Sequence, residues 1–203
     1  MVRNKQINEQ MRAESQGKIL AAARRVFASQ GYFNCTVSDI ARQAGMSQGN
    51  LYWYYPSKEE LLKAVLGDGF ASVEQVLVDA QGYEGDAQAR IEYLIDRYLK
   101  LSHAQGEFTA IFISLLGHGG TPLLQQMGFD PLQIGARYHQ HLSAIFTQAR
   151  AERAVADIDP NTLTVFFFSF YNGLLITYGK DWTMVPELLI RQALMRLLGS
   201  PVA

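Results

Sequence analysis

Side chains that can form hydrogen bonds with nucleic acid gather between Gln48 and Lys58. Gln48 and Asn50 carry amides, and amides near the start of a helix can pair with base edges in the major groove of DNA. The hydroxyls of Tyr52 and Tyr54 and the amine of Lys58 suit phosphate oxygens, which fix the position of a protein on DNA rather than its sequence preference. These residues therefore indicate hydrogen bonding to bases and to the phosphate backbone.

Two short helices with a tight turn between them are predicted to position these groups. The first helix begins at Thr36, whose spacing from Asp39 is typical of a capping box. Gly45 follows the apolar stripe of this helix, where a left-handed residue ends a helix at low cost. Ser47 is a suitable N-cap for a second helix that runs from Gln48 to about Tyr55. The pattern predicts a helix-turn-helix and therefore DNA binding.

The residues around the second helix complete this pattern. Leu51 can face the core, and Gly49 has no Cβ, which lets the backbone approach a duplex closely. Pro56 ends the helix, and Ser57 with Glu60 forms a capping box that starts a third helix. Two helices joined by a glycine turn are also common in other all-α proteins, so an all-α protein-interaction module without DNA binding is the alternative.

A longer stretch of the chain resembles the TetR family of bacterial transcriptional regulators. The resemblance starts with ILAAARRVFASQGY at 19–32, continues with TVSDIARQAGMSQG at 36–49 and ends with LYWYYPSKEELL at 51–62. These segments follow the family's order of a helix ending in Phe and a Gly-aromatic pair, then Thr-Val-x-Asp-Ile-Ala, Ala-Gly-x-Ser-x-Gly, Leu-Tyr and Ser-Lys-Glu-Glu-Leu. Tyr54 and Tyr55 stand where the family often has His and Phe, a departure that bears on operator preference.

The resemblance implies a ligand-responsive repressor that binds a palindromic operator as a homodimer and is released by a small, largely apolar effector. It places Thr36, Tyr54 and Lys58 on phosphates. It places Gln48, Asn50 and Tyr52 on bases or on the adjacent backbone. The full set of expected DNA-binding residues is Thr36, Ser38, Ser47, Gln48, Gly49, Asn50, Tyr52, Trp53, Tyr54 and Lys58.

The distribution of charge agrees with a DNA-binding N-terminal part. Residues 1–65 carry nine Lys or Arg and five Asp or Glu, a net charge of +4, and the total of −1 leaves −5 for the remainder. This asymmetry places positive potential where a polyanion would bind. A solvated and mildly basic face would show the same count, so charge alone does not separate the two interpretations.

Several classes of protein are not indicated by the sequence. The N-terminus lacks an apolar signal core, and the chain has no run of 18 apolar residues, so we expect a cytoplasmic protein without a membrane partner. Cys35 is the only cysteine, and a small buried side chain is its expected role. No Gly-x-Ser-x-Gly elbow, Walker loop or His-Glu-x-x-His helix occurs, so we expect neither an enzyme nor a cofactor or metal.

The rest of the chain is predicted to be helical, which gives an all-α protein of nine or ten helices. We expect a three-helix DNA-binding domain at 1–56 and a helical effector-binding and dimerisation domain at 57–203. The long helix from Ser57 to about Asp79 is expected to end or bend at the glycines of 67–69. The later helices are expected at 87–101, at 107–116, after Pro122, from Pro131 to about Arg153, from Pro160 to about Tyr178, and from Pro186 to Leu198.

The helix from Pro160 is apolar almost all round, so it must be covered on more than one side. In the resembled family the last two helices pair with those of a second copy. The expected dimer interface is Val165, Ser169, Gly173, Ile176, Leu188 and Met195, with Met184 beside them. A central core helix in a monomer is the alternative.

Aromatic residues in the second domain could line an apolar effector cavity. The expected effector-binding residues are Tyr98, Phe108, Phe112, Tyr138, Phe168, Tyr171 and Asn172, and Trp182 is also available. Asn172 stands out because it lies in an otherwise apolar helix and needs a hydrogen-bond partner if it is buried.

Overall fold

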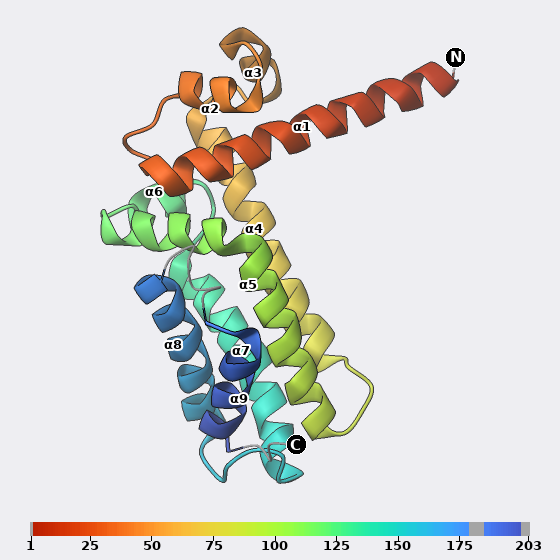
Figure 1. Cartoon of the computed structure of the whole chain (residues 1–203), viewed down its shortest axis with the longest axis vertical. Helices are drawn as coiled ribbons and strands as arrows, with labels where there is room; N and C mark the ends of the chain where they lie inside the picture. The colour runs from red at the N-terminus through yellow and green to blue at the C-terminus, as the bar shows by residue number, and fades with distance from the viewer. Residues whose placement is uncertain (1, 179–184, 200–203) are drawn as a thin grey trace. The chain divides into compact units, whose positions relative to one another are not determined.

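The computed structural model describes residues 2–178 and 185–199, which form nine α-helices and no strand (Figure 1). This arrangement confirms the predicted all-α class. The helices are α1 (Val2–Gln30), α2 (Val37–Ala44), α3 (Gln48–Tyr54), α4 (Lys58–Gln81), α5 (Ala87–Gly117), α6 (Thr121–Gln126), α7 (Pro131–Ala151), α8 (Pro160–Tyr178) and α9 (Glu187–Leu197). None of the described helices is long and apolar enough to cross a membrane.

The helices pack into two compact units. The first unit contains residues 1–69 and 107–120, and the second contains residues 70–106 and 121–203. Both α4 and α5 therefore contribute residues to each unit. The boundary between the packed units falls within α4, and the expected division of function between 1–56 and 57–203 stays a prediction.

The first unit is built on one apolar face of α1, which packs against α2. Ile19, Ala23, Val26 and Phe27 are buried at the three- and four-residue spacing of a helix face. On α3, Leu51 is fully buried and anchors this short helix. The helix expected from Ile19 begins much earlier, at Val2, so α1 extends well beyond its buried face.

The predicted caps of α2 and α3 are confirmed, and at the start of α4 the Ser57 hydroxyl oxygen accepts from the backbone N–H of Glu60 at 3.1 Å, which is one half of the predicted capping box. Thr36 and Asp39 form the complete capping box, and Gly45 ends α2 with a left-handed φ of 70°. The hydroxyl oxygen of Ser47 accepts from the backbone N–H of Asn50 at 3.2 Å. Sequence-local hydrogen bonds thus define the turn that presents α3.

The glycines at 67–69 do not end α4, which continues to Gln81. A Cβ placed on Gly69 would lie 2.1 Å from the ring of Phe108, so this glycine makes room for an aromatic side chain. The expected helices at 87–101 and 107–116 are likewise one helix, α5. Buried Leu99 and Ile111 anchor α5 on both sides of Gly106, whose cost in a helix is only about 1 kcal/mol.

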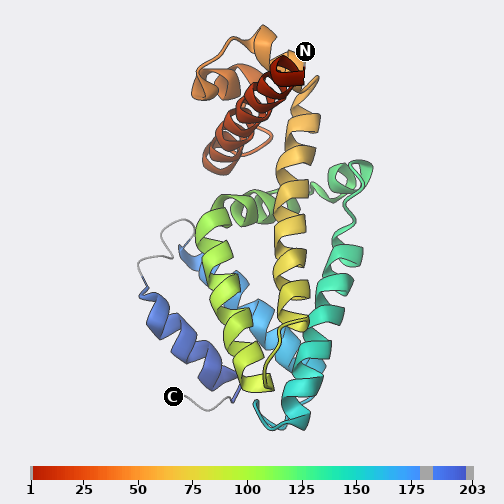
Figure 2. The ribbon, with the colours of Figure 1, turned by 90° about the vertical axis from the view of Figure 1, so that its right-hand side faces the viewer.

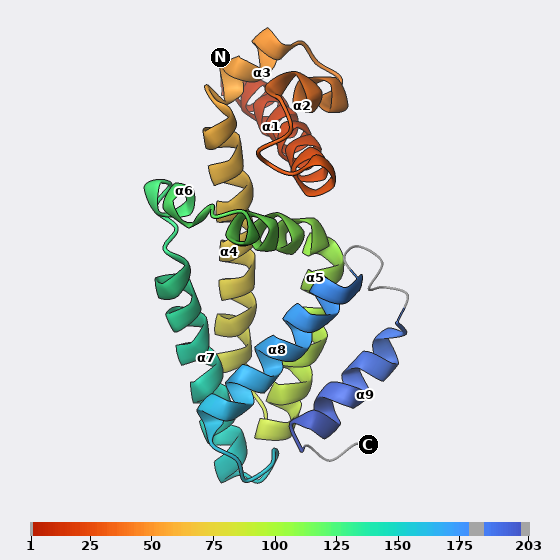
Figure 3. The ribbon, with the colours of Figure 1, turned by 90° about the vertical axis from the view of Figure 1, so that its left-hand side faces the viewer.

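The core of the second unit lies between α5, α7 and α8. Phe167 of α8 is fully buried, and its ring centroid lies 5.0 Å from that of Tyr171 and 5.3 Å from that of Tyr98. In Figures 2 and 3, α7 runs beside the later part of α4, and the Tyr138 hydroxyl donates to the carbonyl of Phe70 at 2.8 Å. Aromatic side chains therefore connect all four helices.

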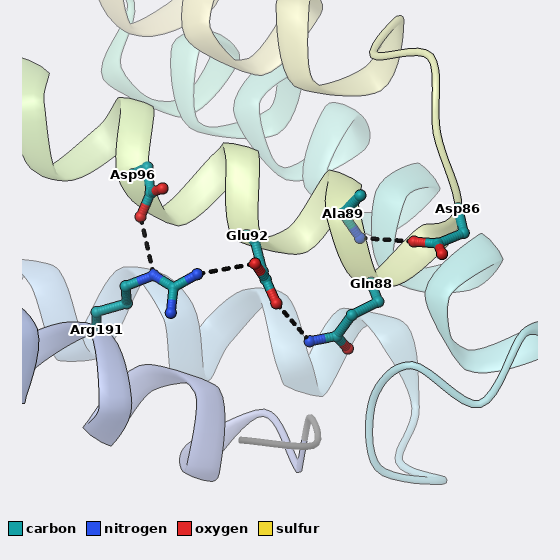
Figure 4. A network of polar contacts seen from close by, with 6 residues as sticks. All are labelled: Asp86, Gln88, Ala89, Glu92, Asp96 and Arg191. Carbon is teal, nitrogen blue, oxygen red and sulfur yellow. Dashed lines mark hydrogen bonds and ion pairs between the residues drawn. The ribbon is translucent and has the colours of Figure 1, made fainter. Parts of the chain in front are cut away.

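A polar network holds α9 against α5 (Figure 4). The guanidinium of Arg191 donates to Asp96 Oδ1 at 3.0 Å and to Glu92 Oε2 at 2.9 Å. Gln88 donates to the other oxygen of Glu92 at 2.9 Å. These groups are partly exposed, so each pair contributes at most about 1 kcal/mol, and the network mainly fixes the position of α9 on α5.

Candidate nucleic-acid interface

The exposed side chains of α3 form the most distinctive polar surface of the first unit. Gln48, Asn50, Tyr52 and Trp53 are exposed around this short helix, and buried Leu51 fixes its orientation. The Nε2 of Gln48 lies 3.5 Å from the Tyr52 hydroxyl, one helical turn away. The Asn50 amide has no hydrogen-bond partner among the described residues. Such groups are available to bind an external partner.

Gly49 supports the same interpretation. A Cβ built on this residue would meet nothing within 4 Å, so packing inside the chain does not require a glycine here. The absence of a side chain instead leaves the backbone of α3 accessible. Ser47 is also exposed, but its oxygen already caps α3.

Thr36 and Ser38 lie exposed at the start of α2. The Thr36 hydroxyl donates to Asp39 Oδ2 at 2.6 Å and accepts from the Asp39 N–H at 3.2 Å. Hydrogen bonds from Thr36 lower the pKa of Asp39 below its ordinary value. The only donor of this hydroxyl is therefore used in the cap, and a phosphate contact by Thr36 would have to replace or share it.

Lys58 has an anchoring role that the sequence did not predict. Its Nζ donates to the carbonyls of Tyr32 at 2.7 Å and Cys35 at 2.9 Å, and it lies 4.5 Å from the centroid of the Tyr32 ring. An ammonium has three donors, so one remains for a phosphate. Tyr54, expected on the same phosphates, is half-buried.

Cys35 itself is buried as expected, and burial raises the pKa of its thiol.

Sequence reasoning also missed a contact between α1 and α3. The guanidinium carbon of Arg12 lies 5.1 Å from the centroid of the Trp53 ring, and Trp53 is 65% exposed. The basic segment before Ile19 could have indicated this contact between Arg12 and Trp53, but that segment was not expected to be helical.

The expected effector residues are only partly brought together. Tyr98, Tyr138, Phe168 and Tyr171 belong to the second unit, where the rings of Tyr98 and Tyr171 lie 4.5 Å apart. Phe108 and Phe112 belong to the first unit, where their rings stack on each other.

Asn172 is exposed, so it does not need a buried hydrogen-bond partner, and its contact with an effector stays a prediction. Phe167, which the expected set omitted, stands at the centre of the aromatic cluster. Its position could not be selected from the sequence because Phe166, Phe167 and Phe168 are equally apolar. Trp182 lies outside the described residues.

One face of α8 and part of α9 expose apolar side chains. Val165 is 53% exposed, Ile176 is 66% exposed and Leu188 is 62% exposed. Ser169 and Gly173 are exposed on α8 as well. The residues that the structure describes therefore leave this face of α8 uncovered.

Met195 does not belong to this exposed set. It is 2% exposed and packs into the core of the second unit, so it cannot present its side chain to a partner, and its assignment to the interface was wrong. Other apolar residues, which the sequence analysis did not select, are exposed instead: Phe166, Leu189 and Leu197. Met184 lies outside the described residues.

Comparisons with known proteins agree with the geometry of the first unit. Residues 19–65 match the model of the family described as bacterial regulatory proteins, tetR family. The HTH-type transcriptional regulator SrpR of Pseudomonas putida is 34% identical over 83 residues, which are 41% of this chain and 39% of that protein. The first curated relatives are matched over only 38 to 62% of their own lengths.

Solved structures show that the similarity of fold extends over most of the chain. The ketosteroid transcriptional regulator KstR2 of Mycobacterium tuberculosis has a TM-score of 0.75 at 19% identity, covering 92% of this chain and 95% of that one. The transcriptional regulator FadR of Bacillus subtilis, solved with stearoyl-CoA, has a TM-score of 0.68 at 20% identity, and the match covers 92% of this chain and 98% of that one. With the capped helix-turn-helix and its motifs, these matches show that residues 19–65 form the segment described for the tetR family of bacterial regulatory proteins, in a chain that has the fold of these solved regulators.

Proposed function

We propose that the chain is a transcriptional regulator that binds a two-fold symmetric operator as a homodimer and releases it when a small effector binds. The observation that carries this proposal is the exposed amide pair of Gln48 and Asn50, held on a capped α3 by buried Leu51. The match of residues 19–65 to the tetR family supports it. The bacterial chromosome lies in the cytoplasm, so this activity belongs there.

In this proposal the residues of the first unit have two roles. Gln48 and Asn50 read bases, because amides form paired hydrogen bonds with adenine in the major groove. Tyr54 and the remaining donor of Lys58 hold phosphates, which add affinity without sequence preference. Two copies of α3 in a symmetric dimer require half-sites about 10 base pairs apart, or a multiple of that spacing.

Removal of the Asn50 amide is expected to reduce operator affinity selectively. Asn50→Ala should cost about 1 to 3 kcal/mol on the operator and barely change binding to random DNA, because a base contact is lost and the phosphate contacts remain. Gel shifts with fragments from upstream of the chain's own gene and its neighbours provide the measurement. Gln140→Ala, which removes an exposed amide from α7, is the matched control and should change neither affinity.

The same assay separates phosphate contacts from base contacts. Lys58→Ala should weaken operator and random DNA alike and reduce the salt slope by about one unit for each contact. Thermal unfolding must accompany this variant, because Lys58 also binds two carbonyls of the chain. If the wild-type chain shifted no genomic fragment, an interaction module without DNA binding would be the better description.

The exposed apolar face of α8 and α9 supports dimerisation. Three apolar side chains are each more than half exposed in the isolated chain: Val165, Ile176 and Leu188. A second copy that packed against this face would bury them and remove apolar surface from water. Ser169 and Gly173 lie between Val165 and Ile176 on α8, and their small size permits close approach of a partner helix. The Arg191 network fixes α9 and therefore the position of Leu188 in this face.

The tyrosine cluster of the second unit supports an effector site. Tyr138 and Tyr171 donate to backbone carbonyls, but the Tyr98 hydroxyl has no hydrogen-bond partner among the described residues. Tyr98 is half-buried, and burial raises the pKa of its hydroxyl, so at neutral pH it is a hydrogen-bond donor. A largely apolar effector with an oxygen acceptor fits these surroundings. Because α4 contributes to both units, it is the candidate transmitter of effector binding.

Loss of the Tyr98 hydroxyl is expected to weaken the response to such an effector. Two compounds are suitable probes. Stearoyl-CoA is an acyl-CoA and is bound in the solved structure of FadR. Androstenedione is a ketosteroid, the class of compound in the name of the regulator KstR2. Tyr98→Phe should raise the concentration of the active probe that releases operator by about two- to tenfold, the effect of one neutral hydrogen bond. Tyr93→Phe on the same helix is the control. A probe bound tightly in the second unit that left operator affinity unchanged would contradict this mechanism.

A further inference from the structure

The N-terminal part of α1 extends beyond the core of the first unit. Among the residues of α1 whose burial is described, which are residue 7 and residues 9–30, the first buried one is Ile19, whereas Ile7 is 47% exposed and Met11 is 60% exposed. Residues 2–18, called here the N-terminal arm, form about 25 Å of helix at 1.5 Å per residue. A helix of this length is marginally stable alone in water, so contacts with a partner would stabilise it.

The arm contacts α3 through one pair of side chains. Arg12 lies with its guanidinium carbon 5.1 Å from the centroid of the Trp53 ring. Among the described side chains, none forms an ion pair with Arg12. A guanidinium stacked on an aromatic face keeps its N–H groups free at its edge, where they can bind phosphate in a bidentate manner. Trp53 therefore holds a cation beside the exposed residues of α3.

The charge of the arm favours a polyanion as its partner. Its basic residues are Arg3, Lys5, Arg12 and Lys18, and its acidic residues are Glu9 and Glu14, which gives a net charge of +2. The surface of the arm near Arg12 continues the surface of α3, because Trp53, on which Arg12 stacks, lies three residues after exposed Asn50 and therefore beside it on the helix. A DNA duplex that met α3 would thus meet further positive charge along α1.

We propose that the N-terminal arm is an additional DNA-binding element, in which Arg12 binds a backbone phosphate beside the bases that α3 reads and Trp53 positions Arg12. The arm extends the protein–DNA contact along the phosphate backbone and adds affinity rather than sequence preference. This inference rests on the proposed function, since it assigns a second contact to the same DNA partner.

The salt dependence of operator binding tests the role of Arg12. A symmetric dimer that carries Arg12→Gln loses two phosphate contacts, so the slope of log affinity against log salt should fall by about 1.8. The loss of affinity should then be about tenfold greater at 50 mM salt than at 200 mM salt. Operator and random DNA should be affected alike.

A matched control removes the same charge from another face of α1. Arg25 is exposed and lies about 140° around the helix from Arg12, at about 100° per residue. Arg25→Gln should therefore leave the salt slope close to that of the wild-type chain. Both substitutions are at exposed positions, and circular dichroism of each variant checks that the helices are retained.

A double-mutant cycle separates positioning by Trp53 from direct contact with DNA. Trp53→Ala should weaken binding in the wild-type background and have little further effect in the Arg12→Gln background. Trp53→Phe, which keeps an aromatic face, should preserve most of the affinity. Additive effects of Trp53→Ala and Arg12→Gln would overturn the positioning role.

Each remaining outcome is also decisive. If the wild-type chain shifted no DNA, the proposed function itself would fail. If the wild-type chain bound its operator and Arg12→Gln gave the same salt slope as Arg25→Gln, the arm would not be a DNA-binding element. If Arg12→Gln changed the oligomeric state in ultracentrifugation and left the slope unchanged, the arm would be a protein contact instead.

Discussion

Two glutamates on the exposed face of α8 are expected to convert the proposed dimer into a monomer and to abolish tight operator binding. Val165 and Ile176 are 53% and 66% exposed in the chain, and in a dimer both would lie against a second copy. Unpaired carboxylates in an apolar interface are strongly unfavourable. A dimer binds two half-sites at once, so its loss should lower operator affinity by about 10²- to 10⁴-fold.

Sedimentation and gel shifts on Val165→Glu/Ile176→Glu measure both effects on the same sample. Val78→Glu is the control, because Val78 is an apolar residue of α4 that is also exposed, at 45%. This control should stay dimeric and bind operator normally. A double variant that remained dimeric with unchanged operator affinity would place the dimer interface elsewhere or exclude it.

The elements that the sequence predicted well are those specified by local contacts. The capping box of Thr36 and Asp39, the left-handed Gly45 and the Asp130–Pro131 start of α7 involve residues a few positions apart. Their hydrogen bonds depend on little beyond the neighbouring backbone. Local rules therefore found the helix-turn-helix and most helix ends.

The errors in the prediction have a common physical cause in tertiary packing. Gly69 was taken as a helix end or bend, but the ring of Phe108, far away in the sequence, fills the space beside it. Lys58 was assigned to phosphate alone, yet it binds carbonyls of a turn more than twenty residues earlier. Neither contact leaves a periodic signal in the sequence.

The face of α8 could not be read from its composition. Apolar residues surround this helix, so hydrophobic periodicity did not distinguish buried Phe167 from exposed Val165. The polar residue Asn172 lies on the exposed face of this apolar helix. An exposed asparagine needs no buried hydrogen-bond partner, so it can indicate which face is uncovered. On α9, Met195 and Leu188 are similarly apolar, but only Leu188 is exposed.

Truncation of Phe167 is expected to be the most destabilising change in the second unit. Its side chain is fully buried, and ring centroids of Tyr98, Phe146 and Tyr171 lie within 6.2 Å of its own. Phe167→Ala would remove these contacts and leave a cavity, at a cost of about 3 to 5 kcal/mol in the free energy of unfolding. In a chain of this length the melting temperature should fall by roughly 6 to 20 °C.

Thermal and urea unfolding at one fixed protein concentration measure this loss, because the stability of a dimer depends on concentration. Leu132→Ala is the control, since Leu132 of α7 is apolar but 83% exposed, and its truncation should cost no more than about 0.5 kcal/mol. Equal losses for the two variants would mean that the aromatic cluster is not the core of the second unit. A loss confined to Phe167→Ala, with the exposed leucine tolerated, would instead assign the stability of α5, α7 and α8 to the rings that meet around Phe167.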